Sequence, residues 1–341
     1  MRALALVILV TAALQAGCAK TVYRHAPGAD FASRCQAAGV VRCFGFDTDA
    51  DFNIGVGGGN GAWGQNFGIF PPAGTSDYNR IQRDTMIAAS GASSMKMIIP
   101  SNVGSDVSGA WFTNFSTDLL TRIGNGQTVF VQWRQRFDTN FITTQYQGRA
   151  PLGNKLVIIG AGDIPGVCNP SFPSTVGCPG SCTDIEVVAS AQMPDTNKVI
   201  RVYNSCVTFS GFEYSDRALG NVTVQNAVGC LYPKYASPPC AKIVANEWMH
   251  FKMELTIGTF NSPNSSFRMW VGREGQASVK ILDFSPATGH PWRAFRNDNT
   301  HEYGKIWLTP YMTNKDRSQT TAVANTWYDE LIISTQDIAD P

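Results

Sequence analysis

Three polar side chains at alternate positions of an otherwise apolar segment are the strongest chemical signal in the sequence. Gln132, Arg134 and Arg136 lie within residues 129–137, VFVQWRQRF. Alternate residues of an extended strand point to the same side, so the amide and the two guanidinium groups would line one face. The opposite face would be apolar and would carry Val129, Val131, Trp133 and Phe137. Guanidinium and amide groups bind carboxylates and hydroxyl groups, so the polar face is predicted to bind a ligand that carries both.

A second set of polar and aromatic side chains lies near the end of the chain. Lys305, Trp307 and Tyr311 fall on one face of a strand by the same alternation. The residues that point the other way are Ile306 and Leu308. A lysine suits an anionic sugar, and an aromatic ring stacks on a sugar face. We expect this face, Lys155 and the arginines to project from a single curved sheet into an open groove.

Regularly spaced half-buried strands must hold these side chains. The chain has 341 residues, with 32 Gly, 18 Pro and only 16% charged residues, which favours a protein of strands and loops. Segments with alternating apolar residues predict an antiparallel β-sandwich, an all-β fold. The clearest of them are 248–257, 267–271, 305–311 and 327–333. One short helix is predicted at residues 77–90, and residues 34–341 are predicted to form a single domain.

The N-terminus is typical of an export signal. Arg2 precedes an apolar run at residues 3–14, which is too short for a permanent membrane span. Cys18 follows Ala16 and Gly17 as in a bacterial lipoprotein, in which the cysteine is acylated; ordinary cleavage nearby is the alternative. Residues 1–18 are therefore predicted to be a signal peptide and 19–33 a tether. This places the protein in the bacterial cell envelope, at the outer membrane if Cys18 is acylated, or outside the cell.

The cysteine count agrees with export. Eight of the nine cysteines remain when Cys18 is set aside, and an oxidising compartment would let them form four disulfides. Cys35 with Cys43 and Cys230 with Cys240 are natural local pairs. Three pairings stay open for Cys168, Cys178, Cys182 and Cys206. Disulfides would hold the loop insertions at 168–182 and 221–239.

The acidic residues and the net charge bear on whether the protein could bind calcium or nucleic acid. Asp47, Asp49 and Asp51 alternate after a predicted first strand and could bind a structural calcium ion through their oxygens; a solvated turn is the alternative. No other cofactor is required. The net charge of +1 provides no field that would attract nucleic acid.

Three segments of the chain resemble the concanavalin A-like jelly rolls, a group that includes lectins and the alginate, heparin and glucuronan lyases. They are NEW at 246–248, YGKIWLTPY at 303–311 and WYDELIIS at 327–334. Together they cover roughly the last third of the chain, to which the strand at 129–137 is added. The resemblance implies a jelly-roll sandwich, here with disulfide-stapled loop insertions.

The resemblance to jelly-roll alginate lyases is more specific. Gln132, Arg134 and Arg136 have the alternation of the RSELR-like strand of these enzymes. Their YFKAGVYNQ-like strand is similar to the segment with Tyr303, Lys305 and Tyr311. Tyr311 follows the lysine by six residues instead of four. The histidine-bearing QIH strand has no equivalent, and residues 155–159 take its place in chain order.

This resemblance implies cleavage of an acidic polysaccharide by β-elimination. Arg134 and Gln132 would neutralise the uronate carboxylate, and Tyr311 would act as acid or base. Substrate would also be bound by Arg136, Lys305, Trp307 and Lys155. The alternatives are a non-catalytic lectin or adhesin and a structural surface protein. A retaining hydrolase is disfavoured, because Asp329 and Glu330 are adjacent and would face opposite ways.

Overall fold

A computed structural model describes most of the chain. The described residues are 29–52, 67–70, 77–103, 108–148, 153–161, 186–192, 199–205, 242–289, 291–294, 302–310, 312 and 315–341. The predicted signal peptide with Cys18, the cysteines from Cys168 onward and Tyr311 lie outside these residues. Within the described part no helix is long and apolar enough to cross a membrane.

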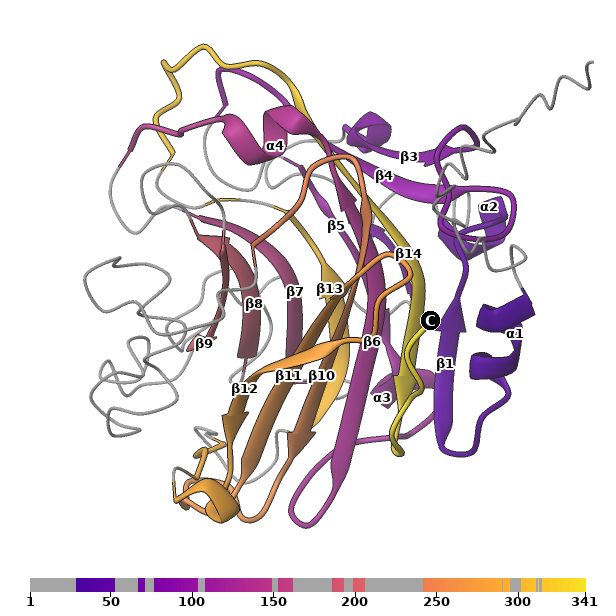
Figure 1. Cartoon of the computed structure of the whole chain (residues 1–341), viewed down its shortest axis with the longest axis vertical. Helices are drawn as coiled ribbons and strands as arrows, with labels where there is room; N and C mark the ends of the chain where they lie inside the picture. The colour runs from indigo at the N-terminus through magenta and orange to yellow at the C-terminus, as the bar shows by residue number, and fades with distance from the viewer. Residues whose placement is uncertain are drawn as a thin grey trace, which may run out of the picture.

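Two antiparallel sheets make up the fold (Figure 1). The larger sheet has the strand order β12-β11-β10-β6-β14-β4-β3, and β1 pairs with β14. Its strands are β1 Val40–Phe44, β3 Ile81–Asp84, β4 Ser94–Ile99, β6 Thr128–Phe137, β10 Trp248–Thr256, β11 Ser266–Arg273, β12 Val279–Phe284 and β14 Ala324–Ser334. The smaller sheet has the order β2-β5-β13-β7-β8-β9. Its strands are β2 Phe67–Phe70, β5 Ala110–Asn114, β7 Gly153–Ala161, β8 Glu186–Gln192, β9 Val199–Ser205 and β13 Tyr303–Leu308.

The helices are short and lie at the ends of strands. They are α1 Ala29–Cys35, α2 Asp49–Phe52, α3 Phe115–Asp118 and α4 Thr139–Thr143, with 3-10 turns η1 Tyr78–Arg80 and η3 Pro286–Thr288. Asp138 caps α4, because its side chain accepts a hydrogen bond from the Phe141 backbone N–H.

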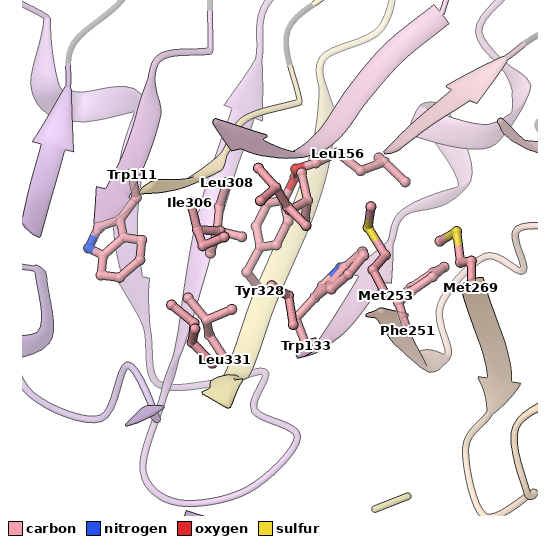
Figure 2. Close-up of a cluster of buried hydrophobic side chains, with 14 of the residues drawn as sticks. Trp111, Trp133, Leu156, Phe251, Met253, Met269, Ile306, Leu308, Tyr328 and Leu331 are labelled. Carbon is pink, nitrogen blue, oxygen red and sulfur yellow. Dashed lines mark hydrogen bonds between the residues drawn. The ribbon is translucent and has the colours of Figure 1, made fainter. Parts of the chain in front are cut away.

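A hydrophobic core fills the space between the two sheets. The larger sheet contributes Trp133 and Phe251, whose rings stack with centroids 5.1 Å apart. The smaller sheet contributes Ile306 and Leu308, both fully buried. Tyr328 of β14 crosses the core, and its hydroxyl donates a hydrogen bond to the Leu156 carbonyl of β7 at 2.9 Å. Figure 2 shows these side chains packed between strands of the two sheets.

The predicted all-β antiparallel sandwich is therefore confirmed. The alternation within residues 129–137 is confirmed as well, since Val129, Val131, Trp133 and Phe137 all belong to the core. The predicted face of β13 is also correct, because Ile306 and Leu308 point into the core while Lys305 and Trp307 do not.

The helix predicted at residues 77–90 is wrong. The segment forms the 3-10 turn η1 and then the edge strand β3, which pairs with β4 through Ile81 and Met97. Ile81 is its buried side chain, while Gln82 and Arg83 are exposed. Pairing with β4 satisfies the backbone groups on one side of β3, so the helical propensity of this short segment does not decide its structure.

A bulge in β14 changes the direction of two carboxylates. The register of β14 against β6 shifts between Asp329 and Ile332, and Glu330 has a left-handed backbone with φ 49°. Asp329 lies opposite Arg134, and Glu330 forms an ion pair with the same arginine. The expectation that Asp329 and Glu330 face opposite ways is therefore wrong, because the extra residue of the bulge puts both on the outward face.

The N-terminal helix is fastened to the sandwich beside β1 (Figure 1). Cys35 at the end of α1 and Cys43 in β1 form a disulfide, which confirms that predicted pair. Helix α1 begins at Ala29, so residues 29–33 of the predicted tether are already helical. Arg34 is only 4% exposed and reaches the outward face of the larger sheet.

Candidate functional site

The residues predicted to form one groove lie on two different faces. Arg134 and Arg136 belong to β6, which pairs with β10 and β14 in the larger sheet. Lys305 and Trp307 belong to β13, which pairs with β5 and β7 in the smaller sheet. Both sets point away from the shared core, and so they lie on opposite sides of the sandwich. The prediction of a single groove is therefore wrong.

On the smaller sheet, a buried lysine lies against two aromatic rings. The Lys305 Nζ is 4.9 Å from the ring centroid of Trp307 and 5.2 Å from that of Phe112. The strand register explains the contact, because Trp307 of β13 lies directly opposite Phe112 of β5. A cation over the face of an aromatic ring is attracted by the ring quadrupole, so the two rings hold the ammonium group in place.

Polar and small residues surround this lysine on the neighbouring strands. Asn114 of β5 lies opposite Lys305, is fully buried, and its Oδ1 accepts a hydrogen bond of 2.8 Å from the Ser116 hydroxyl. Gly160 of β7 lies on the other side and places no side chain beside the ammonium group. Lys155, further along β7, is half-buried. We call the face of Phe112, Asn114, Lys305 and Trp307 the lysine face.

On the larger sheet, an ion-pair network occupies the outward face. Arg34 donates a hydrogen bond of 2.5 Å to the Gln132 Oε1 and forms a short ion pair with Glu330. Arg134 contacts Glu330 at 3.5 Å and Glu274 at 3.7 Å. The two guanidinium groups thus share the Glu330 carboxylate.

The C-terminal residues lie across this network and use further polar groups. Lys252 binds the Asp337 carboxylate at 2.8 Å and the Ile338 carbonyl at 2.9 Å. The Gln132 Nε2 donates to the Ala339 carbonyl at 2.9 Å. The Gln132 amide is therefore held by protein groups at both its oxygen and its nitrogen, and its side chain is fully buried.

His250 occupies a closed position in the same face. It lies opposite Arg134 on one side and Gly272 on the other. A Cβ added at Gly272 would come within 2.2 Å of the His250 ring, so the imidazole lies directly over that glycine. Burial lowers the pKa of His250 to about 4, opposed by the negative charge of Asp340. The imidazole is therefore neutral at pH 7.

The three aspartates proposed for calcium each have a separate protein partner. Asp47 accepts hydrogen bonds from the Ala92 and Ser93 backbone N–H groups. Asp49 forms an ion pair with Arg83, and Asp51 accepts from the backbone N–H groups of Asp47 and Thr48. No group of three acidic, histidine or cysteine side chains among the described residues could hold a metal ion. Calcium binding by Asp47, Asp49 and Asp51 stays a prediction, as does the solvated turn.

Three contributors to these faces were not predicted from the sequence. Phe112 and Asn114 alternate with the buried Trp111 in the segment AWFTN, so the period of two could have identified them. Arg34 had no local signal, because its partners Gln132 and Glu330 lie 98 and 296 residues away in the sequence.

Comparison with solved structures finds similar folds among two lyases and a hydrolase. An alginate lyase from Aplysia kurodai is 13% identical, over 76% of this chain and 88% of that chain, with a TM-score of 0.46. A glucuronan lyase from the fungus Trichoderma reesei is 12% identical, over 79% and 94%, with a TM-score of 0.41. The catalytic domain of a glycoside hydrolase from Coprinopsis cinerea is 9% identical, over 88% and 96%, with a TM-score of 0.43. No protein-family model matches the sequence, and no curated protein matches it. The likeness concerns the fold alone.

Proposed function

We propose that this protein binds an acidic polysaccharide on the lysine face and cleaves it by β-elimination. The observation that carries the proposal is the Lys305 ammonium group on the outward face of the smaller sheet, 4.9 Å from the ring centroid of Trp307 and 5.2 Å from that of Phe112. An ammonium group attracts a carboxylate, and the attraction is less screened where little water is present. Aromatic rings beside it suit the apolar faces of sugar rings.

β-Elimination at a uronic acid needs three groups. A cation or hydrogen-bond donor neutralises the carboxylate, a base removes the neighbouring C–H proton, and an acid protonates the leaving oxygen. Lys305 would neutralise the carboxylate. Tyr311 follows β13 by three residues and remains the predicted acid or base.

A non-catalytic binding protein is the second candidate. It is favoured by the contacts of Gln132 and Arg134, the two other residues predicted to be catalytic. Gln132 is bound by Arg34 and Ala339, and Arg134 contacts Glu330 and Glu274. Neither residue shares a face with Lys305, so the lysine face would have to supply the chemistry without them.

The test is an assay on alginate, glucuronan and heparin that follows the ultraviolet absorbance of the unsaturated product. The lyase proposal expects absorbance to grow with wild-type protein and to be lost in Lys305→Met and in Tyr311→Phe. Lys280→Met is the matched control, because Lys280 is an exposed residue of β12 that forms an ion pair with Asp283. Retained polysaccharide binding without absorbance growth would establish the binding protein instead. Absence of both would contradict the proposed function.

Export belongs to the same proposal. The Cys35–Cys43 disulfide supports it, because disulfides persist in oxidising compartments. Labelling cells with a radioactive fatty acid tests the lipid anchor: label on the wild-type chain that disappears in Cys18→Ala would support acylation, and secretion of unlabelled protein would favour ordinary cleavage.

A further inference from the structure

One exposed residue has a backbone conformation that its side chain does not favour. Leu120, in the loop that connects α3 to β6, has a φ of 53° and is 82% exposed. A left-handed backbone is uncommon for a bulky side chain, and strain of this kind is concentrated at functional sites. Glycine would adopt the same conformation without strain, and an exposed leucine adds nothing to the core. The fold alone therefore does not explain a leucine at this position.

The other non-glycine residues with a positive φ in the described ranges have a structural reason for it. Three of them are asparagines, which tolerate a left-handed backbone: Asn102, Asn246 and Asn261. Phe46 is fully buried in the hydrophobic core, and Glu330 is buried in an ion pair. Leu120 differs from all of them, because its strained backbone directs an apolar side chain into solvent.

Backbone hydrogen bonds hold this loop on both sides of Leu120. The Thr121 N–H donates to the Phe115 carbonyl of α3 at 3.3 Å, and Phe115 is buried in the core. Ile123 and Tyr303 exchange two backbone hydrogen bonds, of 2.7 and 3.1 Å, at the start of β13. Both of these side chains are buried as well. The conformation of the loop is therefore fixed before a ligand arrives, which lowers the entropy lost on binding.

The loop adjoins one end of the lysine face. Helix α3 begins directly after Asn114, which ends β5 and lies opposite Lys305. The Ser116 hydroxyl of α3 donates to the Asn114 side chain, and α3 contacts β13. Tyr303, which holds the other end of the loop, is two residues before Lys305 on the same strand. The loop is therefore continuous with the face on which we place the polysaccharide.

The side chains of the loop suit an anionic sugar polymer. Leu119 is 44% exposed, so two neighbouring leucines present apolar surface. Arg122 is half-buried and forms no ion pair or hydrogen bond in the part of the chain that the structure describes. The C–H groups on the face of a sugar ring can cover apolar side chains, and a guanidinium group binds a carboxylate. A chain of uronic acids offers both kinds of group.

We propose that Leu119, Leu120 and Arg122 form a second contact for the acidic polysaccharide, next to the lysine face, and that they supply affinity and no chemistry. The inference rests on the proposed function, because it concerns the same ligand. A contact that lies away from the reacting bond strengthens the binding of substrate and transition state equally. Its loss should therefore raise KM and leave kcat unchanged.

Affinity electrophoresis of the full chain in native gels that contain alginate, glucuronan or heparin tests the inference. We expect Leu120→Ala to weaken binding of the polysaccharide that the wild type binds by about tenfold, the equivalent of burying one leucine. Leu120→Gly should weaken it equally, while its urea midpoint stays the same or rises, because glycine relieves the strain. Met86→Ala is the matched control and should bind as the wild type does. Met86 is 88% exposed and lies between β3 and β4 of the other sheet.

Arg122→Gln tests the charge of the loop separately. It should weaken binding at low salt, and the difference from the wild type should shrink as sodium chloride is added, because salt screens a solvent-accessible charge. Binding equal to that of the wild type at low salt would remove Arg122 from the contact.

The failure of this inference is distinguishable from the failure of the proposed function. Unchanged binding in Leu120→Ala, with binding lost in Lys305→Met, would overturn the inference alone. A wild-type chain that binds none of the three polysaccharides would overturn both. Weaker binding in Leu120→Gly but not in Leu120→Ala would also overturn it, because the backbone and not the side chain would then matter. Wild-type binding to phosphatidylglycerol vesicles that is lost in Leu120→Ala, with polysaccharide binding intact, would assign the loop to a membrane surface instead.

Discussion

Arg34 and Glu330 form an ion pair that is buried on both sides, although 296 residues separate them in the sequence. The side chains of the two residues are 3% and 2% exposed. Arg34 lies in the last turn of α1 and Glu330 in the bulge of β14, so the pair joins the first described element to the last strand. Gln132 and Arg134 complete it from β6. The outward face of the larger sheet is therefore closed by polar contacts between both ends of the described chain.

Neutralising one side of this pair should destabilise the protein strongly. Glu330→Gln keeps the shape of the side chain but leaves the buried Arg34 and the half-buried Arg134 without their shared anion. Loss of one partner of a buried pair costs about 3 kcal/mol or more, and this should appear as a lower urea midpoint at unchanged slope. Glu247→Gln is the control, because Glu247 pairs with Arg273, which is half exposed, and exposed pairs contribute under about 1 kcal/mol. Equal losses in the two variants would contradict this assignment.

Removing the Cys35–Cys43 disulfide should weaken the same contact. The bridge closes a loop with a sequence separation of 8, which corresponds to about 2.5 kcal/mol by loop entropy. Arg34 directly precedes Cys35. If α1 is no longer held against β1 by the disulfide, the ion pair between Arg34 and Glu330 is weakened as well. The double substitution Cys35→Ser with Cys43→Ser should therefore be less than additive with Glu330→Gln in urea unfolding. Strict additivity would show that the disulfide does not position Arg34.

The sequence was sufficient to predict the faces of individual strands. In β6 and β13 the alternation correctly separated the core residues from the outward ones, because a buried face requires a strict period of two. It did not reveal which strands pair. Arg134 and Lys305 belong to different sheets because β6 pairs with β10 and β13 with β7, and such pairing depends on contacts between distant segments.

Local irregularities account for the other differences. Glu330 adopts a left-handed backbone without the glycine that usually signals one, so the bulge that turns Asp329 and Glu330 to one face had no signature in the sequence. The Arg34 contacts depend on this bulge. Trp248 and Trp327 lie on either side of Arg136, and this arrangement depends on strand pairing that no single segment of the sequence indicates.

A methyl group at Gly272 should collide with His250. The added Cβ would lie 2.2 Å from two ring atoms, and overpacking of this kind costs about 1–3 kcal/mol. The collision depends on the ring, so Gly272→Ala should be less damaging in a His250→Ala background. A double-mutant cycle measured by urea unfolding should give a coupling of about 1 kcal/mol or more. No coupling would mean that the backbone of β11, and not the imidazole, fills this space.

His250 should make stability fall as the solution is acidified. Its pKa in the folded protein is lowered to about 4 by burial, whereas an unfolded histidine has a pKa near 6.5. Between these values the unfolded chain binds more protons than the folded one, so the free energy of unfolding decreases as pH falls through this window. The charged groups that face the imidazole are Asp340, which favours protonation, and Arg134, Arg34 and Lys252, which oppose it. The loss should reach about 2 kcal/mol at pH 5, at about 1.4 kcal/mol per unit.

The pH dependence that is due to His250 is obtained by comparing the wild type with His250→Gln. The other histidines and the carboxylates titrate in both proteins, so their effect on the free energy of unfolding cancels. Urea unfolding of both proteins at pH 7, 6 and 5 should give curves that converge as pH falls, because glutamine carries no proton to gain. The wild type should lose about 2 kcal/mol more than the variant over this range. Parallel curves would place the imidazole in contact with water in the folded state.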